Sequence, residues 1–258
     1  MKIELQRLVY LHDLLRELVV RDLKVRYKRS VLGFAWALVN PLMFLTVFYF
    51  LFKVALALDI PRFGPFAFTG MLVYTWFQSS VLQASGSITD SRELIRWPGF
   101  TAPVLPVVTV TTNLVHLLFA LPLLMIFLFF EGTVPGRVTL LLPVVIAIQF
   151  VFTLGLGYLV AAGNVLFRDI EHLMGVLLQL LFFLTPIFYD ISLVPERFQP
   201  MYRLNPMMHL VQAYRVILLD GTSPTALSLL QLSVLAVVLL VVGHTVFVHL
   251  SYRFVEEL

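Results

Sequence analysis

The sequence predicts an all-α integral membrane protein with six transmembrane helices. Of its 258 residues, 60% are hydrophobic and 13% are charged, and the mean hydropathy is +0.93. Soluble domains are about half apolar and about one quarter charged. Six apolar stretches, most of them near the roughly 20 residues needed to cross a bilayer, account for the excess. We therefore expect a single transmembrane domain over residues 1–258, without a linker to a soluble domain.

The chain before the first apolar stretch is expected to form an amphipathic helix over residues 3–19. Leu8, Leu11, Leu15 and Leu18 recur on one helical face, and charged residues lie mostly opposite. The segment is too charged to cross a bilayer and fits a helix in the plane of the membrane surface. Packing of its apolar face on protein is the alternative.

The spans follow in the order of the apolar stretches. Pro106 and Pro122 predict a kink or tilt in the third stretch, and Pro186 predicts a break near the end of the fifth. The spans are expected at about 32–52, 66–84, 104–130, 138–162, 173–189 and 225–250. The segment 190–224 is too polar to be a span. Its prolines and a predicted helix from Met207 to Leu219 indicate short helices that dip into the outer surface or line an exit.

The positive charges predict the orientation. With the N-terminus inside, the inner segments carry twelve of the 18 Lys and Arg residues, and residues 1–30 alone carry eight. Cytoplasmic segments hold this excess in membrane proteins, so both termini are expected in the cytoplasm. The pI near 9.3 comes largely from this cluster, so the expected partner is a membrane surface and not nucleic acid.

Several kinds of chemistry have no motif in the chain. No lysine follows a glycine-rich turn as in a P-loop, the six histidines lack metal-ligand spacing, and cysteine is absent. The predicted spans contain no Asp, Glu, Lys or Arg, although ion-coupled carriers usually keep such groups at membrane depth. The sequence therefore favours a transport protein without a metal or cofactor of its own and with an external energy source. A membrane enzyme that acts on polyprenyl substrates stays an alternative.

Two inner loops, 85–103 and 163–172, combine charged and apolar residues that a cytoplasmic partner could bind. Solvated turns with positive-inside arginines are the alternative. The 23 Phe, nine Tyr and three Trp residues suit lipid-facing and interfacial positions, and some of them could instead line a passage for sugars. Gly155, Gly157 and Gly163 predict close approach of a neighbouring helix.

Four blocks together resemble a known family. They are "RDLKVRYKRSVLGFAWALVNPLMF", "LIRWPGFTAPVLP", "NVLFRDIEHL" and "TPIFY…LNPMMHLVQAYR". With six spans and a surface helix, the chain resembles the membrane subunit of type-2 ABC exporters for polysaccharides, the Wzm-like permeases for O-antigen, capsule and teichoic acid. The resemblance covers nearly the whole chain.

The resemblance implies a homodimer in the bacterial inner membrane, bound to two nucleotide-binding subunits that hold ATP and Mg. The implied cargo is an undecaprenyl diphosphate-linked glycan, and export of a drug or small lipid by the same architecture is an alternative. The resemblance also implies that the loops 85–103 and 163–172 couple the chain to the ATPase subunits and that a periplasmic gate lies within 190–224.

Three sets of candidate site residues follow from this resemblance. The lipid-headgroup set is Lys24, Arg26, Lys28 and Arg29. The set for coupling to the ATPase subunit is Arg92, Glu93, Leu94, Ile95, Arg96, Arg168 and Asp169. The aromatic candidates for a channel wall are Trp36, Phe44, Phe48, Phe152 and Phe182.

Overall fold

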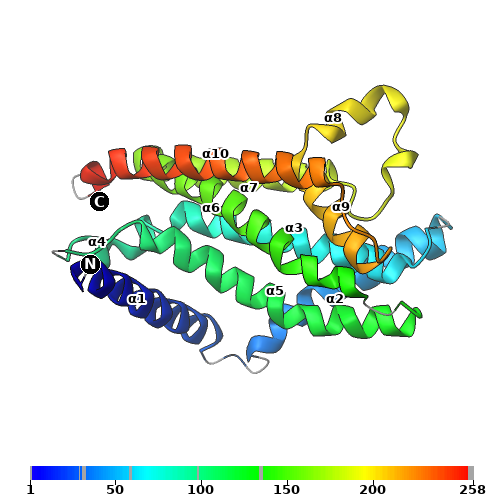
Figure 1. The fold of residues 1–258 in the computed structure, drawn as a ribbon, viewed down its shortest axis with the longest axis horizontal. Coiled ribbons are helices and arrows are strands. Elements are labelled where there is room, and N and C mark those ends of the chain that lie inside the picture. The colour runs from blue at the N-terminus through cyan, green and yellow to red at the C-terminus, as the bar shows by residue number, and fades with distance from the viewer. Residues whose placement is uncertain are drawn as a thin grey trace.

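The computed structural model describes residues 2–28, 30, 33–57, 60–97, 99–133 and 136–254, and this part of the chain is helical without any strand. The helices are α1 (Lys2–Tyr27), α2 (Trp36–Tyr49), α3 (Phe63–Gly86), α4 (Arg92–Ile95), α5 (Val104–Phe130), α6 (Leu142–Leu166), α7 (Asp169–Phe183), α8 (Gln199–Arg203), α9 (Pro206–Leu218) and α10 (Ala226–Leu250). The long helices lie lengthwise in one bundle, and the start of α1, α4 and the end of α10 share one end of it (Figure 1).

α3 is the central helix of the bundle. It contacts α2, α5, α6, α7 and α9, and Phe68, Tyr74 and Val81 on it are fully buried. A helix that is covered by protein on its sides does not have to satisfy a lipid environment, so it can carry polar residues. Gln, Ser and Thr residues are indeed frequent along α3.

The expectation of six spans is met for four in the described residues. Helices that are long and apolar enough to cross a membrane cover Leu38–Ala55, Val104–Phe130, Arg137–Leu166 and Ala226–Arg253. α3 has sufficient length but is too polar by composition, and α7 has only 15 residues. The break predicted at Pro186 explains why α7 is short. The helix ends at Phe183, and the chain then turns inward, which buries Ile187 and Phe188.

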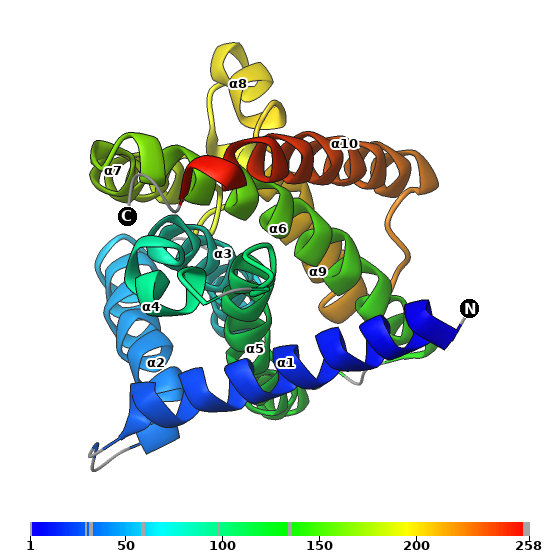
Figure 2. The same ribbon diagram turned by 90° about the vertical axis from the view of Figure 1, so that its left-hand side faces the viewer.

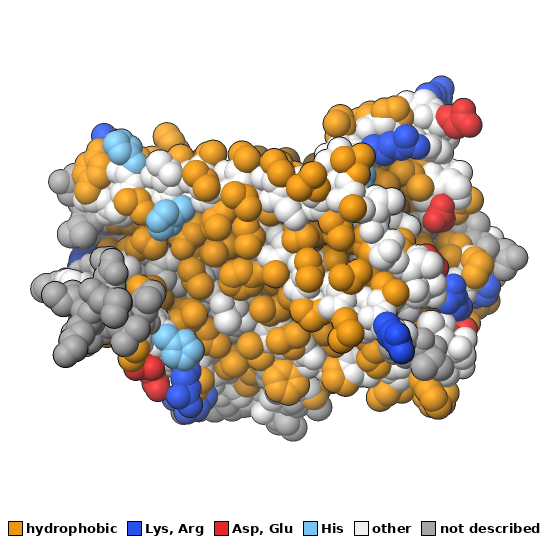
Figure 3. All heavy atoms as spheres, viewed as in Figure 1, with side chains coloured by type: hydrophobic (Ala, Val, Ile, Leu, Met, Phe, Trp, Pro, Cys, Tyr) orange, Lys and Arg blue, Asp and Glu red, His pale blue; other side chains and the backbone are white. Residues whose placement is uncertain are grey.

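The surface is consistent with a lipid environment. Hydrophobic side chains cover the middle of the face shown in Figure 3, and charged side chains gather towards its two ends. Among the exposed side chains are Phe44 and Val47 on α2, Leu180 on α7 and Val238 on α10. Exposed apolar residues of this kind require lipid or another protein to cover them.

α1 is longer than the predicted segment 3–19 and continues through the basic strip to Tyr27. It runs across the end of the bundle in Figure 2. Leu18 and Val19 pack against Val104 and Val108 of α5, so the helix is anchored on protein. Its opposite side exposes apolar groups such as Tyr10, which suits a membrane surface. Packing on protein, the alternative considered from the sequence, is thus confirmed for one face, and the position of the helix in the plane of the membrane stays a prediction.

The close helix approach predicted from the small residues is confirmed between α6 and α10. A Cβ atom on Gly155 would lie 2.6 Å from the backbone carbon of Leu239, and one on Gly243 would collide with the carbonyl oxygen of Gly155. The two backbones therefore touch where these glycines meet. The contact explains why α6 and α10 stay together along their length.

The segment 190–224 has a buried part and a protruding part. The predicted helix 207–219 corresponds to α9, which the side chain of Asn205 caps by accepting from the backbone N–H of Met207 at 2.9 Å. α9 packs on α3, and Leu210 and Tyr214 are buried, so it is a core helix and does not lie on the surface. α8 protrudes from the bundle instead (Figure 1).

Candidate functional site

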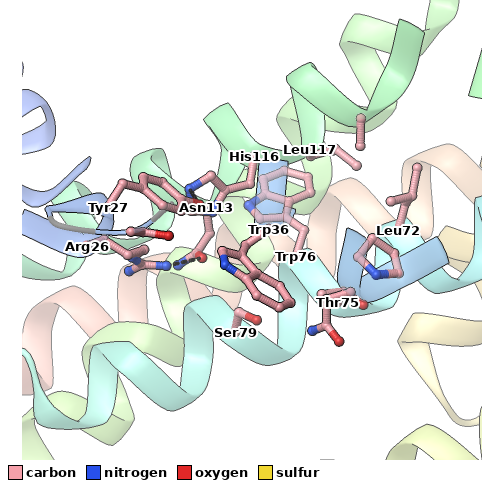
Figure 4. Close-up of a pocket in the computed structure, with 14 residues that line it drawn as sticks. Arg26, Tyr27, Trp36, Leu72, Thr75, Trp76, Ser79, Asn113, His116 and Leu117 are labelled. Atoms are coloured by element: carbon pink, nitrogen blue, oxygen red, sulfur yellow. Dashed lines mark hydrogen bonds between the residues drawn. The ribbon is translucent and has the colours of Figure 1, made fainter. Parts of the chain in front are cut away.

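A polar pocket of about 350 Å³ lies where α1 ends and α2 begins, against α3 and α5. Figure 4 shows Arg26 and Tyr27 on one side, Trp36 in the middle and Thr75 on the other side. Its lining residues are Arg26, Tyr27, Ser30, Trp36, Asn40, Pro41, Leu72, Thr75, Trp76, Ser79, Asn113, His116, Leu117 and Ala120. Residues of four helices and of the connection after α1 thus meet in one hollow.

Arg26 reaches from the last turn of α1 into the bundle. Its Nη2 donates to Oε1 of Gln83 at 2.6 Å, and its Nη1 donates to Oδ1 of Asn113 at 3.5 Å. Asn113 also donates to Oε1 of Gln83 at 3.0 Å, which connects the three side chains. The nearest carboxylate is Asp22, 3.5 Å from Nη2 and 40% exposed. Two neutral oxygens and the carboxylate of Asp22 therefore hold the guanidinium, which stays partly exposed and can be reached by a ligand.

Tyr27 and His116 form a second polar contact in the pocket. The Tyr27 hydroxyl lies 3.0 Å from Nε2 of His116, and the two rings meet edge to face. Burial raises the pKa of the Tyr27 phenol, with a smaller opposing effect from Arg26. Tyr27 is therefore neutral at physiological pH and can donate or accept one hydrogen bond.

Two tryptophans contribute aromatic surface. Trp76 on α3 is buried, and its indole N–H donates to the carbonyl oxygen of Val110 at 3.4 Å. Trp36 on α2 is 48% exposed, so a large part of its ring remains accessible. Asn40, Thr75 and Ser79 also line the pocket, and their side chains make no hydrogen bond to another described residue.

Three of the four predicted headgroup residues lie in the described part of the chain. Lys24, Arg26 and Lys28 are all exposed, and Arg26 in addition donates to Gln83 and Asn113 of the bundle. Arg29 lies outside the described residues. Arg26 also lines a neighbouring hollow of about 210 Å³ together with Arg21, Asp22 and Asp90. Arg26 thus lies between the basic surface of α1 and the polar pocket.

The predicted coupling residues lie at the same end of the bundle as the start of α1. In α4, Arg92 and Glu93 are exposed, and Arg96 directly after the helix is exposed too. Ile95 is only 8% exposed and Leu94 is partly buried, so these two anchor the loop instead of offering a docking surface. The exposed apolar group of this loop is Trp97, at 69%.

In the second inner loop, Arg168 and Asp169 are exposed as expected, next to Phe167 at 69% exposure. The side chain of Asn164 accepts from the backbone N–H of Glu171 at 3.1 Å and so stabilises the first turn of α7.

The aromatic candidates do not form one surface. Trp36 lines the polar pocket, and Phe44 is exposed on the outside of α2. Phe48 stacks on Phe188 with ring centroids 3.8 Å apart. Phe152 is buried at 4%, and Phe182 packs edge to face with Tyr74 in the interior. Phe152 and Phe182 therefore contribute to packing within this chain, and a role of the five aromatics in a channel wall stays a prediction.

Sequence reasoning missed Arg215, which lies on α9 near the other end of the bundle. It is 4% exposed, and its guanidinium donates to the carbonyl oxygens of Pro186 at 2.7 Å, Ile187 at 2.6 Å and Phe66 at 3.1 Å. It also stacks on the Phe66 ring at 3.4 Å. Burial lowers the pKa of Arg215 to about 9, so it is protonated at neutral pH.

The signal for Arg215 was present in the sequence. The positions around it on the same helical face, Val211, Tyr214 and Leu218, are apolar, and an arginine on an apolar face needs buried partners. Counting Arg215 as one more charge in an outer loop concealed this pattern.

Comparison with known proteins agrees with the arrangement of the chain. Residues 13–219 match the family of ABC-2 type transporters. The chain is 39% identical over 247 residues to the O-antigen export system permease protein RfbA of Myxococcus xanthus, with 95% of each chain covered. It is 34% identical over 251 residues to a protein of the same description from Klebsiella pneumoniae, with 96% of each covered.

A more distant relative is the polysialic acid transport protein KpsM of Escherichia coli, at 22% identity over 235 residues, with 88% of this chain and 89% of the relative covered. The helical bundle, the spans and the extent of these matches lead to one assignment. The chain is a multi-pass membrane subunit that belongs to the ABC-2 type transporter family.

Proposed function

We propose that the chain is the transmembrane subunit of an ATP-driven exporter that moves a lipid-linked polysaccharide out of the cytoplasm. The cargo is an O-antigen-like glycan on undecaprenyl diphosphate. The relatives at 33–39% identity are permeases of O-antigen export systems, which supports this cargo class. The observation that carries the proposal is Arg26, a partly exposed cation at the edge of a pocket next to a basic surface helix, bonded to Gln83, Asn113 and Asp22.

The working assembly is a homodimer of this chain with two nucleotide-binding subunits, in the bacterial inner membrane. ATP and Mg bind the nucleotide-binding subunits, and this chain has no catalytic residue of its own. The exposed apolar residues of α2 and α7 supply surface for a second copy or for lipid. α3 and α7 complete six spans: 24 residues of α3 extend about 36 Å, which exceeds a hydrocarbon core of about 30 Å.

In the proposed orientation, the start of α1, α4 and the end of α10 lie in the cytoplasm. These elements share one end of the bundle (Figure 1), and α1, which carries most of the basic residues of the N-terminal segment, begins there. Arg92, Glu93, Arg96, Arg168 and Asp169 then form the exposed surface for the ATPase subunit. Residues 190–204, including α8, then lie on the periplasmic side as a gate.

The headgroup mechanism uses the basic strip in two steps. Lys24, Lys28 and Arg29 attract the lipid diphosphate to the inner leaflet, where each basic residue contributes about 1 kcal/mol. Arg26 then binds the phosphate closest to the bundle, because a guanidinium can contact two phosphate oxygens at once. Movement at the ATPase-binding surface opens the path for the glycan.

The experiment is reconstitution of the complex with its ATPase subunit in liposomes that contain undecaprenyl diphosphate-linked glycan. Arg26→Gln combined with Arg29→Gln should lower substrate-stimulated ATP hydrolysis and export by about tenfold or more, since a hydrogen bond to a charged group contributes about 1.5–3 kcal/mol. Arg137→Gln, at an exposed site far from the strip, is the matched control and should retain activity.

The outcomes separate the alternatives. Unchanged export in a correctly inserted double variant refutes the headgroup role. Stimulation by drugs or small lipids, but not by the glycan, refutes the cargo class. Failure of the chain to co-purify with a nucleotide-binding subunit, together with activity of the purified chain on polyprenyl substrates, refutes the exporter assignment.

A further inference from the structure

We infer that the polar pocket at the end of α1 binds the first sugar of the exported molecule, the unit joined directly to the lipid diphosphate. The inference rests on the proposed function and specifies which part of the cargo enters the pocket. The volume of about 350 Å³ falls in the range of small-molecule sites, about 300–1,000 Å³.

The lining has the chemistry of a carbohydrate site. Among the described residues that line the pocket, Arg26 is the one Lys or Arg, and its guanidinium already contacts Gln83, Asn113 and Asp22. A diphosphate inside the pocket would need several cationic donors. The rest of the lining combines the apolar residues Pro41, Leu72, Leu117 and Ala120 with indoles and with amides, hydroxyls and an imidazole, and these last three kinds of group can donate to or accept from neutral sugar hydroxyls.

Three of these polar groups are available to a ligand. The amide of Asn40 and the hydroxyls of Thr75 and Ser79 line the pocket without a hydrogen bond to another described residue. They come from α2 and α3, and Thr75 lies on the side of Trp36 that is away from Arg26 in Figure 4. A ligand with several hydroxyls could satisfy all three at once.

Trp36 supplies an aromatic face for the sugar. It is 48% exposed and lies in the middle of the pocket, while Trp76 is buried behind it as part of the wall. The apolar face of a pyranose ring packs on an indole in the same way as other apolar groups pack on aromatic rings. A site with a flat aromatic surface and neutral polar groups around it thus favours a sugar over an ion as its ligand.

The position of Arg26 matches the covalent order of the cargo. It lies between the pocket and the neighbouring hollow that Arg21 and Asp90 also line. A diphosphate bound by Arg26 would therefore have the pocket beside it for its sugar. The pocket follows α5 from Asn113 to Ala120, which is about 10 Å along the helix.

A second cavity shows what a site for an acyl or polyprenyl chain looks like in this protein. It measures about 480 Å³, lies between α3, α6, α10 and the segment that precedes α9, and has an almost entirely apolar lining that includes Phe77, Phe152 and Leu239. Apolar ligands favour such a lining because their burial removes apolar surface from water. The polar pocket at α1 is unsuited to that role.

The test measures binding to the complete complex in nanodiscs of phosphatidylethanolamine and phosphatidylglycerol. The probes are undecaprenyl diphosphate and the same lipid carrying one glucose, galactose or N-acetylglucosamine unit. At least one glycosylated lipid should bind about tenfold more tightly than bare undecaprenyl diphosphate. Trp36→Leu and Ser79→Ala should each lower this preference by about two- to tenfold and leave the affinity for the bare lipid unchanged.

Phe129→Leu is the matched control for the aromatic variant. It removes a ring that is 72% exposed at the other end of α5, and it should preserve the preference. Equal affinity for bare and glycosylated lipids overturns the sugar pocket while the headgroup proposal stands. A preference that survives both pocket variants also overturns it. Absence of binding by all four lipids overturns the proposed function itself.

Discussion

Replacing Arg215 with methionine should loosen the end of the bundle where α9 packs on α3. Arg215 connects α9 to the inward turn after α7 and to α3, because its guanidinium donates to carbonyl oxygens of Pro186, Ile187 and Phe66. A Cβ atom on Gly70 would lie 2.8 Å from Nη2, so the backbone of α3 comes close to the guanidinium. Methionine fills most of the space but donates no hydrogen bond.

The expected change in the free energy of unfolding follows from the buried carbonyl groups that lose the Arg215 guanidinium as their donor. Each buried carbonyl that loses its donor costs about 1–3 kcal/mol. Removal of the buried cation offsets part of this cost, because burial of a charge is itself unfavourable. We expect a net loss of about 3 kcal/mol in the free energy of unfolding. For a chain of this size, this loss lowers the midpoint of thermal unfolding by about 6–12 °C.

The assay combines thermal unfolding with site-specific labelling. The chain contains no cysteine, so Ile187→Cys introduces a single thiol at a position that is 1% exposed. Addition of Arg215→Met should raise its rate of maleimide labelling by more than about tenfold, because local opening becomes easier. Arg215→Lys should give an intermediate result, since an ammonium keeps the charge but cannot bridge three carbonyls or stack on Phe66.

Arg203→Met provides the matched control, because Arg203 is exposed on α8 and its guanidinium makes a 3.5 Å hydrogen bond to Gln199. Its effect should stay within about 0.5 kcal/mol. If Arg215→Met unfolds at the same temperature as Arg203→Met and the thiol at position 187 stays protected, Arg215 does not hold this end of the bundle.

Two further sets of substitutions test other contacts. Gly243→Ala should destabilise the α6–α10 pair by about 1–3 kcal/mol, because the added methyl group collides with the Gly155 carbonyl. Gly64→Ala, with open space around the new methyl group, should be neutral in the same thermal unfolding assay, and equal effects would contradict the contact. Trp97→Ala and Phe167→Ala should each weaken co-purification with the ATPase subunit by about tenfold or more without changing unfolding, as exposed aromatics often dominate interfaces. Full retention of the subunit by the double variant would exclude these residues from the interface.

The sequence predicted the apolar helices well and their polar contacts poorly. α5 occupies the predicted span 104–130, and α10 begins within one residue of the predicted start and ends at 250, because long apolar runs bounded by polar turns determine these helices locally. The inward direction of Arg26 depends on Gln83 and Asn113, which lie 57 and 87 residues away. No local pattern contains such information.

Burial by protein explains the remaining differences. Phe152 and Phe182 have the composition of lipid-facing or channel residues, yet neighbouring rings from α3 cover both. Ile95 belongs to a loop with the composition of a docking site, but its side chain packs under that loop. In a chain with 60% hydrophobic residues, an apolar side chain can face lipid, a partner or the core, and the sequence alone does not distinguish these environments.

The departure of α3 from the pattern of a span is itself informative. Thr75, Ser79 and Gln83 contribute to its polar composition, and they are four residues apart, so they lie along one face of the helix. Two of them line the polar pocket, and the third receives the short hydrogen bond from Arg26. Phe66, near the other end of the same helix, accepts from Arg215. Polar residues in a buried helix are costly unless they have partners. Gln83 accepts from Arg26, and Thr75 and Ser79 face an accessible pocket, whereas Thr69 and Ser80 are buried without a partner among the described residues. Three of the residues that make α3 a weak span by composition therefore lie at the proposed binding site.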